Sequence, residues 1–247
     1  MSEHLGWSYR LAPIGDRALV VKLESGDASG LWQTAAALAD AFRAERLTWI
    51  VDVVPAYDSV TIVYEMALIR HGQHAAAVTP YDAATAETNS LLQRARSAVG
   101  ANQPRIVEIP VCYGGPYGPD LAACAARAGL EETVFVKRHA SAQYRVAMIG
   151  FMPGFPYLTG LPQELSQPRL ASPRSAVPAG SVGIAGGHTG IYPLATPGGW
   201  QLIGRTPLRL FDPGRAEPFL LRAGDVLTFV PILAEEYVDM KPGAAEE

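Results

Sequence analysis

The chain has 247 residues, of which 49% are hydrophobic and 18% are charged. This composition is apolar enough to bury a substantial core, and it excludes an intrinsically disordered protein. The 20 Lys and Arg residues against 24 Asp and Glu residues give a formal net charge of -4. A nucleic-acid-binding protein or a helix lying on an anionic membrane would carry a basic surface instead, so we expect neither partner.

The cysteines and the N-terminus indicate a reduced, cytoplasmic setting. Cys112 and Cys124 are too few for a disulfide framework, and their spacing matches no zinc or redox motif. The first residues lack the basic and apolar segments of a signal peptide. No His-Glu-x-x-His pair occurs, and we predict no metal site in this chain.

One stretch of the chain carries no Asp, Glu, Lys or Arg. It covers the 30 residues Ser175–Gly204, which include eight glycines and three prolines. Its length would suit a membrane span, but this many glycines and prolines exclude a spanning helix. The stretch is therefore predicted to be a run of loops and short strands in a soluble protein.

Residues 1–104 are predicted to form an α+β domain, because glycine and proline are sparse there and hydrophobic patterns alternate between strand and helix. The Thr79-Pro80 pair is typical of a helix start, with Thr as N-cap and Pro in the first turn. The order β-α-β-β-α-β matches a ferredoxin-like, split βαβ domain. The expected elements are strand Tyr9–Leu23, helix Ser29–Arg46, strands Thr48–Val54 and Ser59–Tyr64, a helix from Pro80 ending at Gly100, and strand Arg105–Val111.

Residues 105–236 are predicted to form a closed β-barrel or sandwich, because short strands there alternate with Gly/Pro turns. Helices are expected over Leu121–Ala128 and Glu131–His139, with His139 as a favourable charge at a helix C-terminus. Residues 237–247 are predicted to be a C-terminal tail, of which Gly243–Glu247 is expected to be frayed. The expected strands are Val146–Ile149, Val182–Ile184, Trp200–Ile203, Leu208–Phe211, Phe219–Leu221 and Val226–Val230.

The candidate functional residues lie in the glycine- and proline-rich loops of this second part. No lysine follows a glycine, so a phosphate-binding P-loop is excluded. Arg174 and Arg205 bracket the charge-free stretch, where a guanidinium suits a carboxylate or phosphate. His188 stands inside a glycine-rich loop and is either a functional group or simply a hydrogen-bonded histidine. Most of the glycines can equally serve barrel corners, and the aromatic residues can equally be core or cleft-wall residues.

Several segments closely resemble the family of 5-oxoprolinase B subunits, which includes the kinase inhibitor KipI and proteins labelled allophanate hydrolase subunit 1. The resemblance runs from about Tyr9 to Ile232. It is carried by Gly150–Leu158 (GFMPGFPYL), Val177–Gly186 (VPAGSVGIAG), Thr189–Pro193 (TGIYP), Thr196–Leu208 (TPGGWQLIGRTPL), Pro13–Ala18 (PIGDRA) and Ile109–Gly115 (IPVCYGG).

The resemblance implies an α+β N-terminal domain followed by a cyclophilin-like β-barrel. It implies a protein that is inactive alone and that works with two partners of 5-oxoprolinase, the C subunit, which is a related barrel, and the A subunit. The complex is expected to hydrolyse 5-oxoproline to glutamate with ATP as co-substrate. The alternatives are a KipI-type inhibitor that binds a sensor histidine kinase, and a carboxyltransferase-like subunit that acts on a urea-like substrate. The amidase machinery of allophanate hydrolase is absent from the sequence.

On this basis we assign roles to the loop residues. His188 and Arg205 are the expected catalytic residues, although family members commonly carry Gln at position 188, and only His can titrate near neutral pH. The remaining assignments are substrate binding by Arg174, Gly186, Gly187, Thr189, Tyr192 and Gln201, with backbone amides near Gly186 to Gly190 stabilising an oxyanion, and a partner interface at Phe151, Phe155 and Tyr157.

Overall fold

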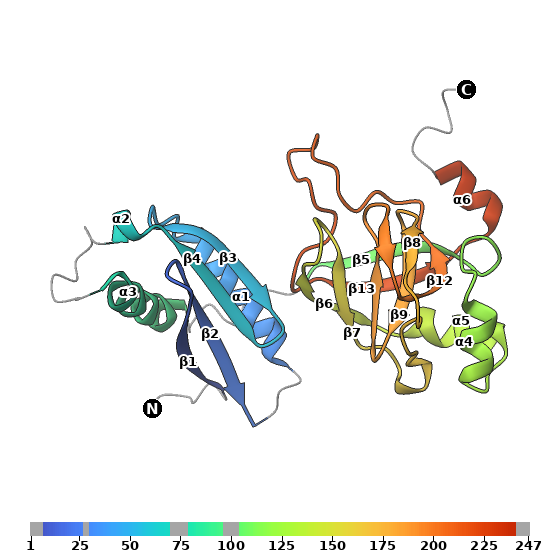
Figure 1. Cartoon of the computed structure of the whole chain (residues 1–247), viewed down its shortest axis with the longest axis horizontal. Helices are drawn as coiled ribbons and strands as arrows, with labels where there is room; N and C mark the ends of the chain where they lie inside the picture. The colour runs from blue at the N-terminus through green and yellow to red at the C-terminus, as the bar shows by residue number, and fades with distance from the viewer. Residues whose placement is uncertain (1–6, 27–29, 70–78, 96–103, 241–247) are drawn as a thin grey trace. The chain divides into compact units, whose positions relative to one another are not determined.

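The computed structural model describes residues 7–26, 30–69, 79–95 and 104–240. The chain divides into two compact units, Met1–Gln103 and Pro104–Glu247 (Figure 1). Within the described ranges, no helix is long and apolar enough to cross a membrane.

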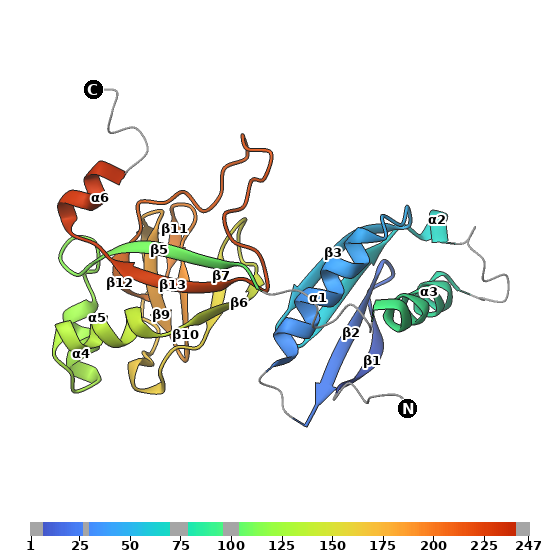
Figure 2. The same cartoon turned by 180° about the vertical axis from the view of Figure 1, so that it is seen from behind.

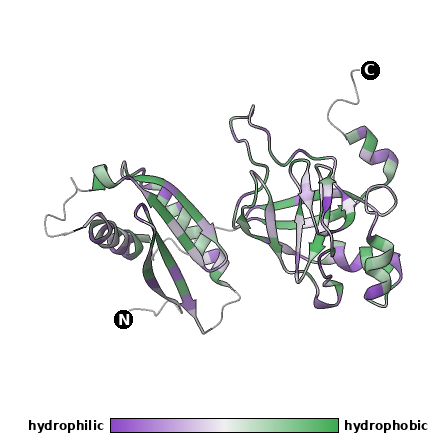
Figure 3. Cartoon of the chain, in the orientation of Figure 1, coloured by the Kyte–Doolittle hydropathy of each residue, from purple (hydrophilic) through white to green (hydrophobic). Residues whose placement is uncertain are grey.

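The first unit is an antiparallel sheet with helices packed against it. The strands lie in the order β1-β2-β4-β3. Leu19, Val60 and Phe42 are among the side chains buried between the sheet and α1. Buried and partly buried residues alternate along β2 and β4, and the sheet carries both hydrophobic and hydrophilic residues (Figure 3), as expected for a sheet with one face on the core. The elements are β1 (Trp7–Ile14), β2 (Ala18–Ser25), α1 (Leu31–Ala44), β3 (Ile50–Ala56), β4 (Ser59–Tyr64), α2 (Met66–Ile69) and α3 (Pro80–Ala95).

This sheet differs from the expected split βαβ order in two places, so a ferredoxin-like domain is not confirmed. The predicted first strand, Tyr9–Leu23, is a hairpin of β1 and β2. The predicted last strand, at Arg105–Val111, is β5 (Ile106–Tyr113) and belongs to the second unit. The edge of the sheet next to β2 is therefore filled by β1 from the hairpin. A strand following α3 would have filled it in the expected arrangement.

The start of α3 agrees with the sequence-based prediction. The Thr79 Oγ1 accepts the backbone N–H of Asp82 at 3.1 Å, and the Asp82 carboxylate accepts the Thr79 N–H at 3.0 Å. This reciprocal cap satisfies donors that the first helical turn leaves without partners. The predicted helix end at Gly100 lies outside the described residues.

The second unit is a closed barrel of seven strands. The strands follow the order β6-β13-β5-β12-β9-β10-β7, and a β6–β7 pairing closes the ring. The β13–β5 pair is parallel and the other barrel pairs are antiparallel. The strands not yet given are β6 (Tyr144–Ile149), β7 (Pro156–Thr159), β9 (Ser181–Ala185), β10 (His188–Ile191), β12 (Gln201–Arg205) and β13 (Val226–Pro231).

Helices pack beside the barrel, whose interior is filled by aliphatic and aromatic side chains such as Val182, Ile184 and Phe229. Figures 1 and 2 show α4 and α5 together on one side of the barrel, with α6 following β13. A separate two-stranded sheet pairs β8 with β11. These further elements are α4 (Leu121–Arg127), α5 (Glu132–Ser141), the short helix η2 (Gln163–Leu165), β8 (Arg174–Val177), β11 (Thr196–Gly198) and α6 (Ala234–Met240).

Three expectations for this unit were wrong in detail. Leu208–Phe211 and Phe219–Leu221 are not strands, because a single bridge between Phe211 and Phe219 joins them. The boundary predicted at residue 237 falls inside α6, where Tyr237 is buried and contacts Tyr117 at a ring-centroid distance of 4.5 Å. The part of the tail beyond Met240 lies outside the described residues.

Candidate functional site

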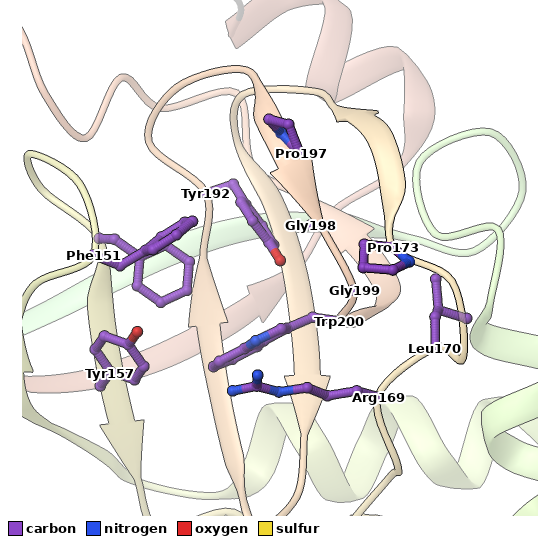
Figure 4. Close-up of a pocket in the computed structure, with 11 residues that line it drawn as sticks. Phe151, Tyr157, Arg169, Leu170, Pro173, Tyr192, Pro197, Gly198, Gly199 and Trp200 are labelled. Atoms are coloured by element: carbon purple, nitrogen blue, oxygen red, sulfur yellow. The ribbon is translucent and has the colours of Figure 1, made fainter.

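A pocket of about 430 Å³ opens on the outer face of the barrel (Figure 4). A volume of this order and a largely apolar lining are typical of small-molecule sites. Five of its lining residues come from the charge-free stretch Ser175–Gly204, so that stretch does build a concavity. The lining residues are Phe151, Phe155, Tyr157, Arg169, Leu170, Pro173, Tyr192, Pro197, Gly198, Gly199 and Trp200.

The wall of this pocket is a cluster of aromatic rings. Phe155 lies at its centre, with ring centroids 5.0 Å from Tyr157, 5.2 Å from Tyr192 and 5.4 Å from Trp200. The Tyr192 and Trp200 rings meet Phe155 nearly edge to face, which is a favoured arrangement of aromatic pairs. With Val177 these rings belong to a hydrophobic cluster separate from the barrel core. The pocket is therefore built on a packed hydrophobic cluster that is separate from the barrel core.

Glycines make room for these rings on the strands beneath them. A Cβ atom at Gly190 would lie 2.9 Å from the Pro156 carbonyl oxygen and 3.0 Å from ring atoms of both Phe155 and Trp200. A Cβ atom at Gly198 would lie 2.5 Å from the Tyr192 hydroxyl oxygen. Both positions exclude any side chain, so the glycines of the TGIYP and TPGGW segments have a packing reason.

Tyr192, a predicted substrate-binding residue, is buried beneath the pocket surface. Burial raises the pKa of its hydroxyl, and a hydrogen bond from the Trp200 backbone N–H and the charge of Arg169 partly offset that rise. The Tyr192 hydroxyl therefore fixes the position of Trp200 and stays protonated at neutral pH. It forms a wall of the pocket and is no base.

Arg169 carries the one charged side chain among the eleven lining residues. In Figure 4 it lies beside Trp200 with its guanidinium directed into the pocket. Among the described residues no carboxylate forms an ion pair with it. Sequence reasoning missed Arg169, because it considered only the two arginines that border the charge-free stretch. No local pattern marks Arg169, and its position depends on a contact between distant segments.

That contact holds the segment Gln167–Leu170, called the strap below, across the barrel. The Gln167 and Gly186 backbones exchange two hydrogen bonds, at 2.7 and 3.3 Å. The Leu170 N–H donates to the Gly199 carbonyl at 2.8 Å. The buried Gln201 side chain donates to the Pro168 carbonyl at 2.9 Å. Two residues predicted to bind substrate, Gly186 and Gln201, thus hold the strap just before Arg169, at Gln167 and Pro168. Gly199 holds it just after Arg169, at Leu170.

His188, Gly186 and Gly187 lie together at the β9–β10 turn, outside the pocket lining. The Gly186 N–H already donates to the Gln167 carbonyl, so this amide is not available to stabilise an oxyanion. His188 pairs with Ala185 and alternates with Thr189, which points into the barrel. His188 therefore projects from the same outer face as the aromatic cluster.

Thr189 is buried inside the barrel and not at the pocket. Its hydroxyl donates to the Gly183 carbonyl at 2.9 Å and lies 3.2 Å from Nε2 of His139. The expectation of a charged His139 at the C-terminus of its helix is wrong, because the ring is fully buried and stacks on Phe229 at 4.7 Å. Burial lowers the pKa of His139 to about 3.

Arg174 is engaged by a carboxylate of its own chain. Its Nη2 donates to both Asp120 carboxylate oxygens, at 2.7 and 2.9 Å, and the Leu202 N–H donates to the same carboxylate at 2.6 Å. Asp120 thereby links the loop before α4 both to Arg174 on β8 and to Leu202 on β12. A substrate anion would have to compete with Asp120 for this guanidinium.

Arg205 lies at the far end of β9 from His188. Arg205 pairs with Ser181, whereas His188 pairs with Ala185. Four residues along a strand span about 13 Å. The Arg205 Nε donates to the Ala179 carbonyl at 2.7 Å, and its charge acts on the hydroxyl of Tyr237 in α6. The two predicted catalytic residues are therefore not brought together by this chain.

The three predicted interface residues all line the pocket. Phe155 is 1% exposed and is a core residue of the aromatic cluster. Tyr157 is half-buried, and Phe151 is 65% exposed at the rim. Phe151 also adopts a positive φ of 68°, a strained conformation for a bulky residue.

A second reactive site could consist of metal-ligating side chains or of an activated thiol. Within the described ranges, no group of three or more His, Cys, Asp or Glu residues could hold a metal ion. Cys112 and Cys124 are buried free thiols, and burial raises the pKa of both, that of Cys124 to about 11. Neither thiol is therefore an activated nucleophile.

Comparison with known proteins places the chain in a family. The model of the carboxyltransferase domain, subdomain C and D, matches residues 9–221. The chain is 45% identical over 224 residues to the 5-oxoprolinase B subunit of Escherichia coli O157:H7, covering 88% of this chain and 94% of that protein. It is 39% identical over 232 residues to the 5-oxoprolinase B subunit of Bacillus subtilis (strain 168), covering 93% and 95%.

Solved structures agree with this relationship. TTHA0988 superposes with a TM-score of 0.72 at 34% identity, covering 88% of this chain but 40% of that longer chain. PH0987 from Pyrococcus horikoshii superposes with a TM-score of 0.53 at 36% identity, covering 92% and 100%. The urea carboxylase of Kluyveromyces lactis has the same fold at 20% identity, with a TM-score of 0.62 over 93% of this chain and 22% of that one. The chain therefore belongs to the family of the carboxyltransferase domain, subdomain C and D, and of the 5-oxoprolinase B subunits.

Proposed function

We propose that this chain is the B subunit of an ATP-dependent complex that hydrolyses 5-oxoproline to glutamate. The observation that carries this proposal is the sequence identity of 39–45% to proteins named as 5-oxoprolinase B subunits. The alignments cover nearly the full length of this chain and of each of those proteins. The aromatic pocket supports it, because its size and lining suit a small cyclic amide.

The chemistry of the lining supports a protein that needs partners. Opening a lactam requires activation of its carbonyl oxygen, which ATP would supply by phosphorylation. Water would then attack the ring carbon and the carbon–nitrogen bond would break, and hydrolysis of the resulting acyl phosphate would release glutamate and inorganic phosphate. None of the eleven lining residues is Asp, Glu, His, Cys or Lys. The pocket therefore contains no side chain that could act as a general base near neutral pH. The A and C subunits of the complex would supply the ATP site and the missing acid–base groups.

His188 and Arg205 remain predictions as catalytic residues. His188 projects from the same face of β10 as the aromatic cluster, so a partner that covers this face would enclose it with the pocket. Arg205 lies at the other end of β9 from His188, so its catalytic role requires that the substrate or a partner subunit reach that end as well. The roles of Gly187, as an amide donor, and of Thr189, as a polar support inside the barrel, belong to the same proposal.

The test is co-expression with candidate A and C subunits, followed by assays of ATP hydrolysis and glutamate formation. We expect ATP hydrolysis that depends on 5-oxoproline and on all three proteins. His188→Gln should keep most of this rate, because Gln can make the same hydrogen bonds but cannot titrate. If the assembled complex hydrolyses no ATP in response to 5-oxoproline, the proposed function is wrong. If Arg205→Ala leaves the rate unchanged in a folded complex, its catalytic assignment is wrong.

A further inference from the structure

We propose that the pocket of this chain binds small monocarboxylic acids with a flat, largely apolar body, and that Arg169 holds the carboxylate. This inference assigns a ligand class and an anchoring residue to the pocket. It relies on the proposed function only for the choice of 5-oxoproline as the first ligand to test.

The charge of the lining favours a single negative charge on the ligand. Arg169 is the one cation among the eleven lining residues, and none of the others is acidic. Its guanidinium presents two parallel N–H donors that match the two oxygens of a carboxylate. A phosphate dianion would carry one negative charge more than the single cation of the lining neutralises.

The strap places Arg169 in position before any ligand arrives. Backbone bonds at Gln167 and Leu170 fix the chain on either side of it, to Gly186 and Gly199 respectively. The Gln167 side chain is itself buried, donates to the Cys124 carbonyl at 3.2 Å and accepts from Arg127. A preorganised anchor loses little conformational entropy on binding. The strap therefore has the properties of a binding segment.

The shape of the lining favours a flat body. The Trp200, Tyr157 and Tyr192 rings and the Pro173 and Pro197 rings surround the space (Figure 4). Gly198 and Gly199 complete the lining. Flat amide or ring groups stack well on such surfaces. A five-membered lactam with a carboxylate has this combination of groups, and the volume leaves room for a larger ring as well.

The experiment is calorimetric titration of the purified full chain. The ligands are 5-oxoproline, 2-pyrrolidinone, which has the ring without the carboxylate, and inorganic phosphate. The variants are Arg169→Gln and Arg169→Lys, with Arg222→Gln as a matched control because Arg222 is exposed and outside the lining. We expect 5-oxoproline to bind at least about tenfold more tightly than 2-pyrrolidinone or phosphate. Arg169→Gln should remove this preference, Arg169→Lys should keep part of it, and Arg222→Gln should change nothing.

Two results would overturn the inference. One is that 5-oxoproline fails to bind the wild-type chain, and the other is that Arg169→Gln binds it as tightly as wild type. Circular dichroism of each variant checks that it is folded. The experiments distinguish a failure of this inference from a failure of the proposed function. A complex that hydrolyses 5-oxoproline while this chain shows no binding refutes only the pocket assignment, and a chain that binds 5-oxoproline but forms no active complex refutes only the function.

Discussion

Nε2 of His139 on α5 lies 3.2 Å from Oγ1 of Thr189 on β10, and both side chains are fully buried. The single hydroxyl proton of Thr189 is donated to the Gly183 carbonyl. Thr189 must therefore accept the proton of His139 Nε2–H, and His139 Nδ1 accepts the hydroxyl of Tyr113 at 2.9 Å. This fixes one tautomer of a neutral imidazole and makes a continuous polar chain from α5 to β9.

The neutral His139 predicts acid sensitivity of the barrel. Its folded-state pKa is lowered to about 3, below the unfolded value of about 6.5, so the unfolded chain takes up a proton that the folded chain cannot. The stability is fully present above pH 6.5 and falls as the pH drops toward 3, by up to about 1.4 kcal/mol per pH unit. Urea unfolding at pH 7, 6 and 5 measures this. In His139→Gln, the glutamine can make both hydrogen bonds but does not titrate, so the unfolding free energy should depend less on pH than in the wild type. The same pH dependence in both proteins would contradict a buried, neutral His139.

The Asp120–Arg174 pair predicts a structural role for Arg174. Arg174→Ala leaves the Asp120 carboxylate half-buried with one partner fewer, and should cost about 1–3 kcal/mol of unfolding free energy. Asp120→Asn should cost a similar amount, and the double variant little more than either one. Urea unfolding of the three variants tests this cycle. Strictly additive losses would show that the two side chains act independently, and would favour a substrate role for Arg174.

Sequence patterns correctly predicted the elements that depend on interactions between residues close together in the chain. The alternation in Ser59–Tyr64 and the Thr79 cap have short-range causes, and both features are present as expected. The strands β7 and β10 were missed because glycine and proline hide their alternation, and their edges are set by partners far along the chain. Arg169 was missed for the same reason, since its place depends on the pairing of Gln167 with Gly186. The loop Gly150–Leu158 was predicted as a partner interface, because a proline-stiffened aromatic loop is unusual in itself, and Phe151, Phe155 and Tyr157 of this loop line the pocket.

The same substitution, glycine to alanine, should destabilise the protein at Gly190 and have no effect at Gly187. Gly190→Ala forces a methyl group against Pro156, Phe155 and Trp200, and should cost about 1–3 kcal/mol and distort the pocket. Gly187→Ala meets no atom within 4 Å and keeps its backbone N–H, so stability and ligand binding should be unchanged. Thermal unfolding and ligand titration of both variants make the comparison. Loss of binding in Gly187→Ala would point to a ligand contact at the β9–β10 turn.

We expect Phe151 to contact a partner subunit, and we expect its substitution to weaken that binding without unfolding the isolated chain. A phenylalanine with a φ of 68° and 65% exposure keeps a conformation that costs about 1–2 kcal/mol, and on the surface of one chain little compensates for it. Phe151→Asn suits this backbone conformation, so the isolated chain should stay within about 1 kcal/mol of wild type in urea unfolding. Its affinity for the C subunit should fall at least about tenfold in a binding titration, as expected for an aromatic anchor. Val134→Asn, at an exposed position on α5, is the matched control and should leave that affinity unchanged. Wild-type affinity in Phe151→Asn would remove the rim of the pocket from the interface, and would leave the strained conformation of Phe151 to the packing of its ring, 5.7 Å from that of Phe155.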